Sequence, residues 1–475
     1  MIVKRLLNTL LLLLIGTLSA SAVNKLITVP APNGALLNDD FTVKVRQKEQ
    51  EWKTIPSYLV KVQAVKGLKR LTEDASVGYF DFEGEVEVSV TYNKGNLNTA
   101  RVRPLSYGIQ HKIDGNTLTF KLNSPKNISV EVNGDIFHNL HLFANPIDKY
   151  IPDTNNPDLI HFGAGIHQIA EEELKIPSGK TVYLAAGAIL KFRLHIDSAE
   201  NVKILGRGMV CHTIKQGIKI SNSKNILVEG VIATQCSTGG SENVTIRNTK
   251  SISYYGWGDG MNVFASNNVL HDGVFCRNSD DCTTVYATRL GYEGGCKNIT
   301  MQNSVLWADV AHPIFIGIHG NANEPEIIEN LNYFNIDILD HRENQIDYQG
   351  CMAINAGDNN LIRNVRFENI RVENFRKGQL VNIRVFYNPK YCQAPGRGVE
   401  DVLFKNITYT GDNAELSIIS GYDENRKVKN IRFENLNING QVISDDMPDK
   451  PGFYKTADIA RFYINEHTEN ITFNK

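Results

Sequence analysis

The sequence predicts an all-β protein, a right-handed parallel β-helix preceded by a small N-terminal β-sandwich. Two observations carry this prediction. Between residues 24 and 150, short segments alternate apolar and polar residues with a period of two, as half-buried strands do. From about residue 155 onward, an apolar motif that begins with Asn recurs along the chain, and such a repeat is the signature of a solenoid.

The N-terminal module, residues 23–150, contains three clear strand segments, at 86–92, 118–122 and 128–132. The dipeptides Asp114-Gly115 and Asn133-Gly134 lie between or after them and favour tight hairpin turns. Short strands with regular turn signals are typical of a β-sandwich. We find no catalytic constellation in this module.

The repeats place residues 151–475 in the β-helix. An Asn or Asp at a corner tolerates the left-handed conformation and bonds to its equivalent on the next coil. A leucine-rich repeat is the competing solenoid, but the leucine spacing and a helical period are missing. The copies begin at Asn201, Asn225, Asn243, Asn268, Asn298, Asn330, Asn364, Asp401, Asn430 and Asn470.

The N-terminus has the features of a signal peptide covering residues 1–22. Lys4 and Arg5 precede a short apolar run, and Ala20-Ser21-Ala22 resembles a cleavage site. The apolar run is shorter than the roughly 20 residues that a membrane span needs. We therefore expect a protein secreted to a periplasm or to the outside of the cell.

Composition limits the partners. A chain of 475 residues predicts two domains or one elongated domain. The net charge of −2 gives no basic surface for nucleic acid or for anionic membrane. The seven cysteines form no CxxC pair, so we expect no metal site and no cofactor. Most should be buried apolar residues, with Cys276 and Cys282 the candidate disulfide, and we expect a monomer.

Three aspartates are the main functional candidates. Asp259 and Asp280 lie 21 residues apart, close to one coil, and Asp281 follows directly. Equivalent positions on adjacent coils are about 4.8 Å apart, so the three carboxylates should gather on the outer face of one sheet. Carboxylates so close raise one another's pKa, and hydrolysis of a glycosidic bond needs one protonated and one ionised carboxyl. The alternatives are a solvated aspartate ladder and a calcium site.

These motifs resemble the polygalacturonase family (glycoside hydrolase family 28) and its relative, the dextranase and isopullulanase family (family 49). Asp259 matches the Asp of the Asn-Thr-Asp-Gly segment, with Trp257-Gly258 in place of Asn-Thr, and Asp280 and Asp281 match the Asp-Asp pair. The resemblance implies an inverting hydrolase in which Asp280 is the general acid, while Asp259 and Asp281 hold and deprotonate water. Segments 127–134 and 140–145 resemble the family's N-terminal sandwich, and segments 162–167, 182–188 and 206–208 its entry into the β-helix.

The resemblance also suggests substrate-binding residues. His312 matches a His that lies beside the carboxylates, although its flanking glycines are replaced; His319 is the structural alternative. In the family, an Arg-Ile-Lys segment binds the carboxylate of a uronate. The equivalent position in this sequence is residues 350–355, which contain neither Arg nor Lys. This absence favours a neutral, dextranase-like α-linked substrate over polygalacturonate, with Arg384 the cation that the next coil offers.

Aromatic residues near the aspartates are candidates for stacking on sugar rings. We favour Trp257 and Tyr286 for this role. Of these two together with Tyr255, Tyr292 and Trp307, we expect about half to be core residues.

The principal hypothesis is a secreted inverting glycoside hydrolase on an α-linked poly- or oligosaccharide. A polygalacturonase, a polysaccharide lyase, which needs calcium and a basic residue, and a non-catalytic glycan-binding β-helix are the alternatives.

Overall fold

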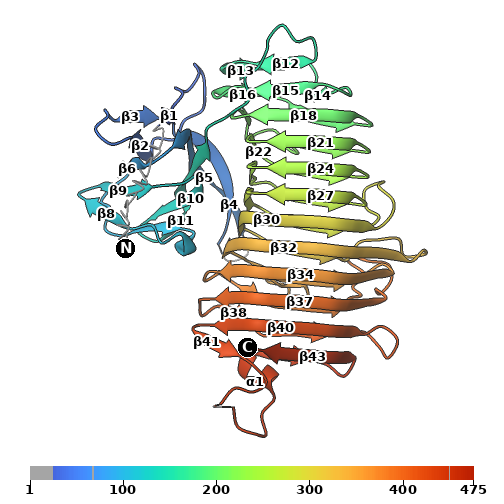
Figure 1. The fold of residues 1–475 in the computed structure, drawn as a ribbon. Coiled ribbons are helices and arrows are strands. Elements are labelled where there is room, and N and C mark those ends of the chain that lie inside the picture. Colours follow the sequence, from blue (N-terminus) through green and yellow to red (C-terminus); the bar gives the residue numbers. More distant parts are fainter. Residues whose placement is uncertain (1–24, 67–68, 449) are drawn as a thin grey trace, which may run out of the picture.

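The computed structural model describes residues 25–66, 69–448 and 450–475. A long stack of parallel strands runs from β12 to β43, and the N-terminal strands form a separate body beside its upper half (Figure 1). The predicted fold class is therefore confirmed. The predicted signal peptide, residues 1–22, lies outside the described residues.

The N-terminal body consists of two sheets that pack face to face around an apolar core, including Phe41, Val88 and Ile128. Asn133 and Gly134 both have positive φ (55° and 78°), which the predicted two-residue hairpin turn between β10 and β11 requires. One sheet comprises β1 (Lys25–Ile27), β4 (Tyr58–Lys66), β5 (Lys69–Glu83), β7 (Ala100–Arg103), β10 (Lys126–Val132) and β11 (Asp135–Pro146). The other comprises β2 (Phe41–Arg46), β3 (Lys53–Ile55), β6 (Val86–Tyr92), β8 (His111–Asp114) and β9 (Thr117–Leu122).

The β-helix contains two large sheets, in which the pairings are parallel except that β41 runs antiparallel to β40. The nineteen-stranded sheet comprises β12 (Leu159–Phe162), β13 (Gly165–His167), β15 (Thr181–Leu184), β16 (Ala188–Leu190), β18 (Glu200–Gly206), β19 (Met209–Val210), β21 (Lys224–Glu229), β22 (Ile232–Ala233), β24 (Glu242–Arg247), β25 (Lys250–Ile252), β27 (Asn267–Asp272), β28 (Phe275–Asn278), β30 (Cys296–Ala308), β32 (Glu326–Asp340), β34 (Asn360–Val372), β37 (Gly398–Tyr409), β40 (Val428–Ile438), β41 (Gln441–Ile443) and β43 (Thr468–Asn474). The eleven-stranded sheet comprises β14 (Glu173–Lys175), β17 (Arg193–Asp197), β20 (Ile218–Ser221), β23 (Cys236–Gly239), β26 (Met261–Phe264), β29 (Thr283–Tyr286), β31 (Ile314–Gly317), β33 (Met352–Ala356), β36 (Val381–Val385), β39 (Ser417–Ser420) and β42 (Phe462–Ile464). Smaller elements are the pair β35 (Gly378–Gln379) and β38 (Ala414–Glu415), the 3₁₀ turns η1 (Leu105–Tyr107) and η2 (Ile346–Tyr348), and helix α1 (Thr456–Ala460).

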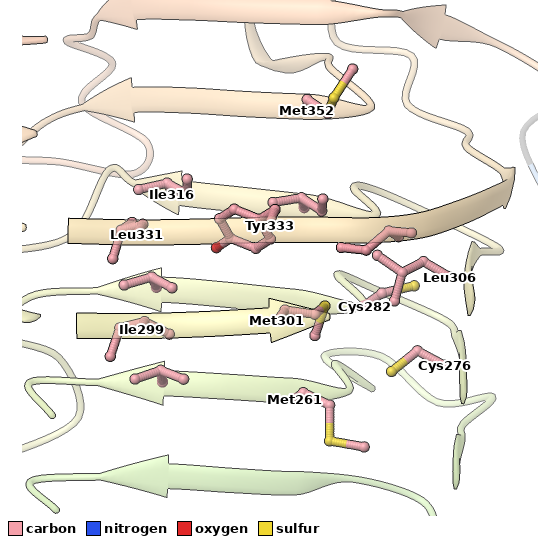
Figure 2. Packing of buried hydrophobic residues seen from close by; sticks show 14 of the residues in the cluster. Met261, Cys276, Cys282, Ile299, Met301, Leu306, Ile316, Leu331, Tyr333 and Met352 are labelled. Atoms are coloured by element: carbon pink, nitrogen blue, oxygen red, sulfur yellow. The ribbon is translucent and has the colours of Figure 1, made fainter. Parts of the chain in front are cut away.

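The interior of the β-helix is a single apolar column. Inward side chains from both sheets meet there, as Figure 2 shows for Met261 and Ile316 opposite Ile299 and Leu331. All seven cysteines are buried free thiols. The predicted disulfide between Cys276 and Cys282 is therefore wrong; both side chains pack as apolar residues in this column (Figure 2).

The repeated asparagines occupy one corner of the coil, which we call the asparagine corner. It comprises Asn201, Asn225, Asn243, Asn268, Asn298, Asn330, Asn364, Asp401, Asn430 and Asn470, all with φ between 55° and 59°. The side-chain amide of Asn298 donates to Asn268 Oδ1 at 2.9 Å, and Asn330 donates to Asn298 at 3.1 Å. The left-handed corners and the bonding along the stack are thus confirmed.

The sandwich is fixed to the β-helix through a buried polar contact. The Arg277 guanidinium, from β28, bonds to Asp309 in two places at 3.1 Å and also to Asn139 Oδ1 at 2.8 Å and the Ile136 carbonyl at 2.8 Å. Both members of the Arg277–Asp309 ion pair are fully buried. Apolar residues of β4, such as Val60 and Val62, pack against Phe275 of the β-helix in the same interface.

Candidate active site

The candidate site lies where the chain enters successive strands of the eleven-stranded sheet; we call this the acidic corner. Asp259 precedes β26, Asp280 and Asp281 precede β29, and His312 precedes β31. Main-chain bonds join these turns from coil to coil, Gly260 N–H to Asp281 O at 2.8 Å and Cys282 N–H to His312 O at 2.8 Å. A Cβ at position 260 would collide with the Cys282 carbonyl, so glycine permits this close approach.

Asp281 is the most firmly held of the three carboxylates. Its Oδ1 accepts hydrogen bonds from the main-chain N–H of His312 at 3.0 Å and from His312 Nδ1 at 2.7 Å. Its Oδ2 accepts the hydroxyl of Tyr286 at 3.2 Å. Three donors thus fix the orientation of this buried carboxyl group.

His312 completes this pair as a cation. Its other ring nitrogen, Nε2, lies 2.6 Å from the carbonyl oxygen of Tyr348, so both ring nitrogens face acceptors and only the imidazolium donates to both. Burial alone lowers the pKa of His312, but the charge and hydrogen bond of Asp281 outweigh it and raise the pKa above its usual value. The ring is also stacked on Phe315, with centroids 4.3 Å apart.

The other two carboxyls are protonated more easily than ordinary aspartates. Burial, followed by the charge of Asp281, raises the pKa of Asp259 to about 7. Burial, with the charges of Asp259 and Asp281, raises the pKa of Asp280 well above its usual value. Asp259 Oδ2 also accepts a hydrogen bond from Asn262 at 2.7 Å. The three aspartates therefore form one cluster, in which the charge of Asp281 contributes to the raised pKa of both Asp259 and Asp280.

Two loops meet beside the cluster, over the outer face of the sheet. Tyr348, in η2, stacks on Tyr391 with centroids 4.5 Å apart. Gln345 Oε1 accepts bonds from the Tyr391 hydroxyl at 2.7 Å and from Lys390 Nζ at 2.9 Å. These contacts cover the sheet on the C-terminal side of His312, while Asp259 and Asp280 remain partly exposed.

The aromatic candidates differ in exposure. Trp257 is 86% exposed and lies two residues before Asp259 with a φ of 56°. Tyr286 is buried, because Phe264, Phe315 and His319 surround its ring. Tyr286 thus faces Asp281 through its hydroxyl and has no free face for a sugar, whereas Trp257 has one.

The structure does not bring Arg384 to the aspartates. Its Nη1 donates to the Asp347 carbonyl at 2.6 Å, and it pairs in register with Asn355, two strands beyond β31. Asn355, in the register expected for the uronate clamp, is fully buried and bonds to Asn382 at 3.1 Å.

Sequence reasoning overlooked four contributors. Asn262 follows Asp259 by three residues in the same motif and was detectable by that spacing. Tyr348 acts through its main-chain carbonyl, which leaves no signal in the sequence.

The other two are exposed arginines, Arg70 and Arg289. They lower the pKa of Asp280 and Asp259 respectively, against the larger effect of burial. Arg289 also lines a pocket of about 370 Å³ with His319 and Lys390.

Neither a metal centre nor a membrane span emerges from these residues. Within the described ranges, no group of three His, Cys, Asp or Glu side chains is arranged to hold a metal ion. In the same part of the chain, no helix has the length and apolar character needed to cross a membrane.

The β-helix fold and a match to a family model together show a glycoside hydrolase of the β-helix type. The family model for "Glycosyl hydrolases family 28" matches residues 195–450, more than half of the chain, and the protein belongs to that family. No curated protein sequence matches the chain significantly.

Among solved structures, the chain is similar in fold to Dex49A from Penicillium minioluteum, with a TM-score of 0.58 and 11% identity over 93% of this chain and 96% of that one. A family 28 exopolygalacturonase from Yersinia enterocolitica gives a TM-score of 0.47 and 13% identity over 81% and 96% of the two chains.

Proposed function

We propose that the protein is an inverting glycoside hydrolase in which Asp280 is the general acid and Asp259 and Asp281 activate the water. The observation that carries this proposal is the gathering of three carboxyls in unequal environments. Burial and the charges of Asp259 and Asp281 raise the pKa of Asp280 well above its usual value, which favours the protonated form that a general acid needs. Asp259, with a pKa of about 7, is matched to accepting a proton from water near neutral pH.

Asp281 acts in this scheme as the fixed negative charge. Its bonds to His312 and Tyr286 hold it ionised and oriented, and its charge raises the pKa of both neighbours. His312 and Tyr286 are then positioning residues, and Trp257 is the aromatic surface on which a sugar ring stacks.

For the substrate we propose a neutral, α-linked poly- or oligosaccharide. A uronate needs a cation at its carboxylate to offset desolvation. The clamp register holds Asn355 instead, and Arg384 is occupied by the Asp347 carbonyl.

Pectic galacturonan is the second candidate, and a different observation favours it. Arg70 and Arg289 both affect the carboxyl cluster electrostatically, so cations reach the site from outside the clamp register. Family membership points the same way.

We further propose that the protein is exported and works as a monomer. Residues 1–22 would be removed as a signal peptide, leaving a sandwich domain over 23–150 and a catalytic β-helix over 151–475. In the described chain β11 ends at Pro146 and β12 starts at Leu159, which supports a boundary near residue 150.

The test is hydrolysis of dextran, pullulan, polygalacturonate and galactan, with the products followed by chromatography. NMR determines the anomeric configuration of the reducing end when it is first released. The proposal expects cleavage of one neutral α-glucan, initial inversion, and a loss of at least about 10³-fold in kcat for Asp280→Asn, because no acid remains for the leaving oxygen.

Asp197→Asn is the matched control, since Asp197 is exposed at the end of β17 and is remote from the cluster in the sheet order. It should keep wild-type activity. Hydrolysis of polygalacturonate alone would select the second candidate. Undiminished turnover by Asp280→Asn, or no hydrolysis of any of the four polysaccharides, would contradict the catalytic proposal.

A further inference from the structure

The β4–β5 hairpin of the N-terminal sandwich extends away from its own core and along the β-helix. Figure 1 shows this hairpin beside the stack as far as the level of β30 and β32. Its buried face, with Val60, Val62 and Ala64, packs on Phe275 and Trp307. Residues of this hairpin lie outside the segment 195–450 that matches family 28.

A main-chain bond fixes the hairpin at the coil next to the carboxylates. The N–H of Gln63 donates to Asp309 Oδ2 at 3.3 Å, and the N–H of Asp309 in turn donates to the Asn278 carbonyl at 2.8 Å. Asn278 is two residues before Asp280. The hairpin is therefore attached directly to the turn that carries the proposed acid.

Beyond Gln63, β4 continues to Lys66, and β5 begins at Lys69. Val65, two residues further along β4, pairs with Arg70 of β5, and two residues correspond to about 6.6 Å of strand. Side chains alternate between the two faces of a strand, so Arg70 shares its face with the cross-strand pair Lys61 and Asp74. That pair interacts with His212, which lies in the turn before β20 at the same edge of the sheet.

Arg70 is an unoccupied cation at this position. Its side chain is exposed, and within the described residues no protein hydrogen bond or ion pair engages its guanidinium. It is close enough to Asp280 to lower the pKa of that carboxyl against the opposing effects of burial and neighbouring anions. A second guanidinium, that of Arg342, lies within its electrostatic reach; burial, then Arg376 and, least of the causes, Arg70 lower the pKa of Arg342.

We propose that Arg70, supplied by the N-terminal sandwich, is a substrate-binding residue of the active site and donates hydrogen bonds to the sugar on the leaving-group side of Asp280. As the general acid, Asp280 must face the glycosidic oxygen that it protonates. A hydrogen-bond donor beside Asp280 on its solvent-exposed side would therefore contact the sugar of the leaving group. A guanidinium offers five N–H donors in a planar fork, which suits adjacent hydroxyl oxygens. This inference rests on the hydrolase proposed above and gives the sandwich a direct role in catalysis.

The experiment compares Arg70→Ala, Arg70→Lys and Lys69→Ala with wild type on the polysaccharide that wild type cleaves. Lys69 is the matched control, because it is the neighbouring exposed cation on the same hairpin and its side chain points to the opposite face. Arg70→Ala should lower kcat/KM about 10- to 100-fold through the loss of charged hydrogen bonds. Lys69→Ala should stay within twofold of wild type.

A second readout separates binding from a general structural effect. Arg70 favours the ionised form of Asp280, so Arg70→Ala should raise the pKa of the acid and move the alkaline limb of the kcat/KM profile to higher pH. Arg70→Lys retains the charge, so its limb should stay near that of wild type while kcat/KM falls. Thermal unfolding should be unchanged in all three variants.

Equal kcat/KM values for Arg70→Ala and Lys69→Ala would overturn the role of Arg70 and leave the hydrolase intact. Failure of wild type on every polysaccharide would instead remove the proposed function on which this inference rests.

Discussion

Two corners of the same coil solve opposite problems. At the asparagine corner, asparagine repeats from Asn201 to Asn470 with Asp401 as the single substitution, and the side chains are mostly exposed and bond along the stack. At the acidic corner, the side chains differ from coil to coil, and a buried carboxylate meets a buried imidazolium only between Asp281 and His312 among the described residues. One corner stabilises the stack by repetition, and the other departs from repetition to raise two pKa values.

The difference between the two corners is that side chains bond to one another in the first and repel one another in the second. Stacked amides can bond to one another from coil to coil because each carries both a donor and an acceptor. Stacked carboxylates have no donors and repel each other, so they need partners from elsewhere. The acidic corner obtains them for Asp281 from Tyr286 and His312. Asp309, a buried carboxylate on the next coil, is paired with Arg277, which also bonds to Asn139 of the docked sandwich.

The largest effect expected on stability comes from breaking the buried ion pair between Arg277 and Asp309. Arg277→Met leaves Asp309 buried without its bidentate partner, and the free energy of unfolding should fall by about 3–5 kcal/mol. Urea unfolding measures the loss. Lys61→Met, which breaks a half-exposed ion pair with Asp74, should cost less than about 1 kcal/mol. Similar losses of unfolding free energy in both variants would show that burial does not make the Arg277–Asp309 pair more important for stability than the half-exposed Lys61–Asp74 pair.

A smaller and opposite effect is expected at the cluster itself. The folded pKa of Asp259, about 7, lies above its unfolded value of 3.8. Ionisation is therefore disfavoured in the folded state, so stability is fully present below about pH 4 and is lost as the pH rises through 7. Asp259→Asn removes this loss and should stabilise the protein by about 1–2 kcal/mol at pH 8.

The pH dependence is the decisive part of that experiment. The gain for Asp259→Asn, measured by urea unfolding, should shrink toward zero at pH 4, where the native aspartate is already protonated. Asp197→Asn, on an exposed carboxyl, should change stability by less than about 0.5 kcal/mol at either pH. A gain of equal size at pH 4 and pH 8 would exclude ionisation of Asp259 as its cause.

The contrast between the corners also explains what the sequence could predict. The asparagine corner is visible because local geometry dictates it: a left-handed residue must recur once per coil, and Asn is the side chain that tolerates it. The three aspartates were found for the same reason, since their spacing matches one coil. Arg70 and the Tyr348 carbonyl were not predictable, because no local rule brings a hairpin from another domain, or a main-chain oxygen from a later loop, to a given coil.

Tyr286 and Cys276 illustrate a second limit. Alternation predicts that a strand residue faces in or out, but it cannot predict that Phe264, Phe315 and His319 will cover the outward ring of Tyr286. Likewise, the sequence could not exclude a disulfide between Cys276 and Cys282, which are separated by five residues. Both are instead stacked in the apolar column as free thiols.

The smallest effect tests the asparagine corner at its one substituted position. Asp401 accepts a bond from Asn430 at 2.9 Å, but within the described chain no side-chain bond joins it to Asn364, since a carboxylate has no N–H to donate. Asp401→Asn would supply the missing donor and keep the left-handed conformation, so it should stabilise the protein by about 0.5 kcal/mol.

Asp401→Ala should destabilise it by about 1–2 kcal/mol, because alanine disfavours the left-handed φ of 57° and also loses the bond from Asn430. Chemical unfolding of both variants measures the two changes. If Asp401→Asn is neutral while Asp401→Ala is destabilising, the corner depends on backbone conformation alone and the amide bonds along the stack contribute nothing net. If both variants are neutral, repetition at this corner does not stabilise the stack, and the comparison with the acidic corner fails.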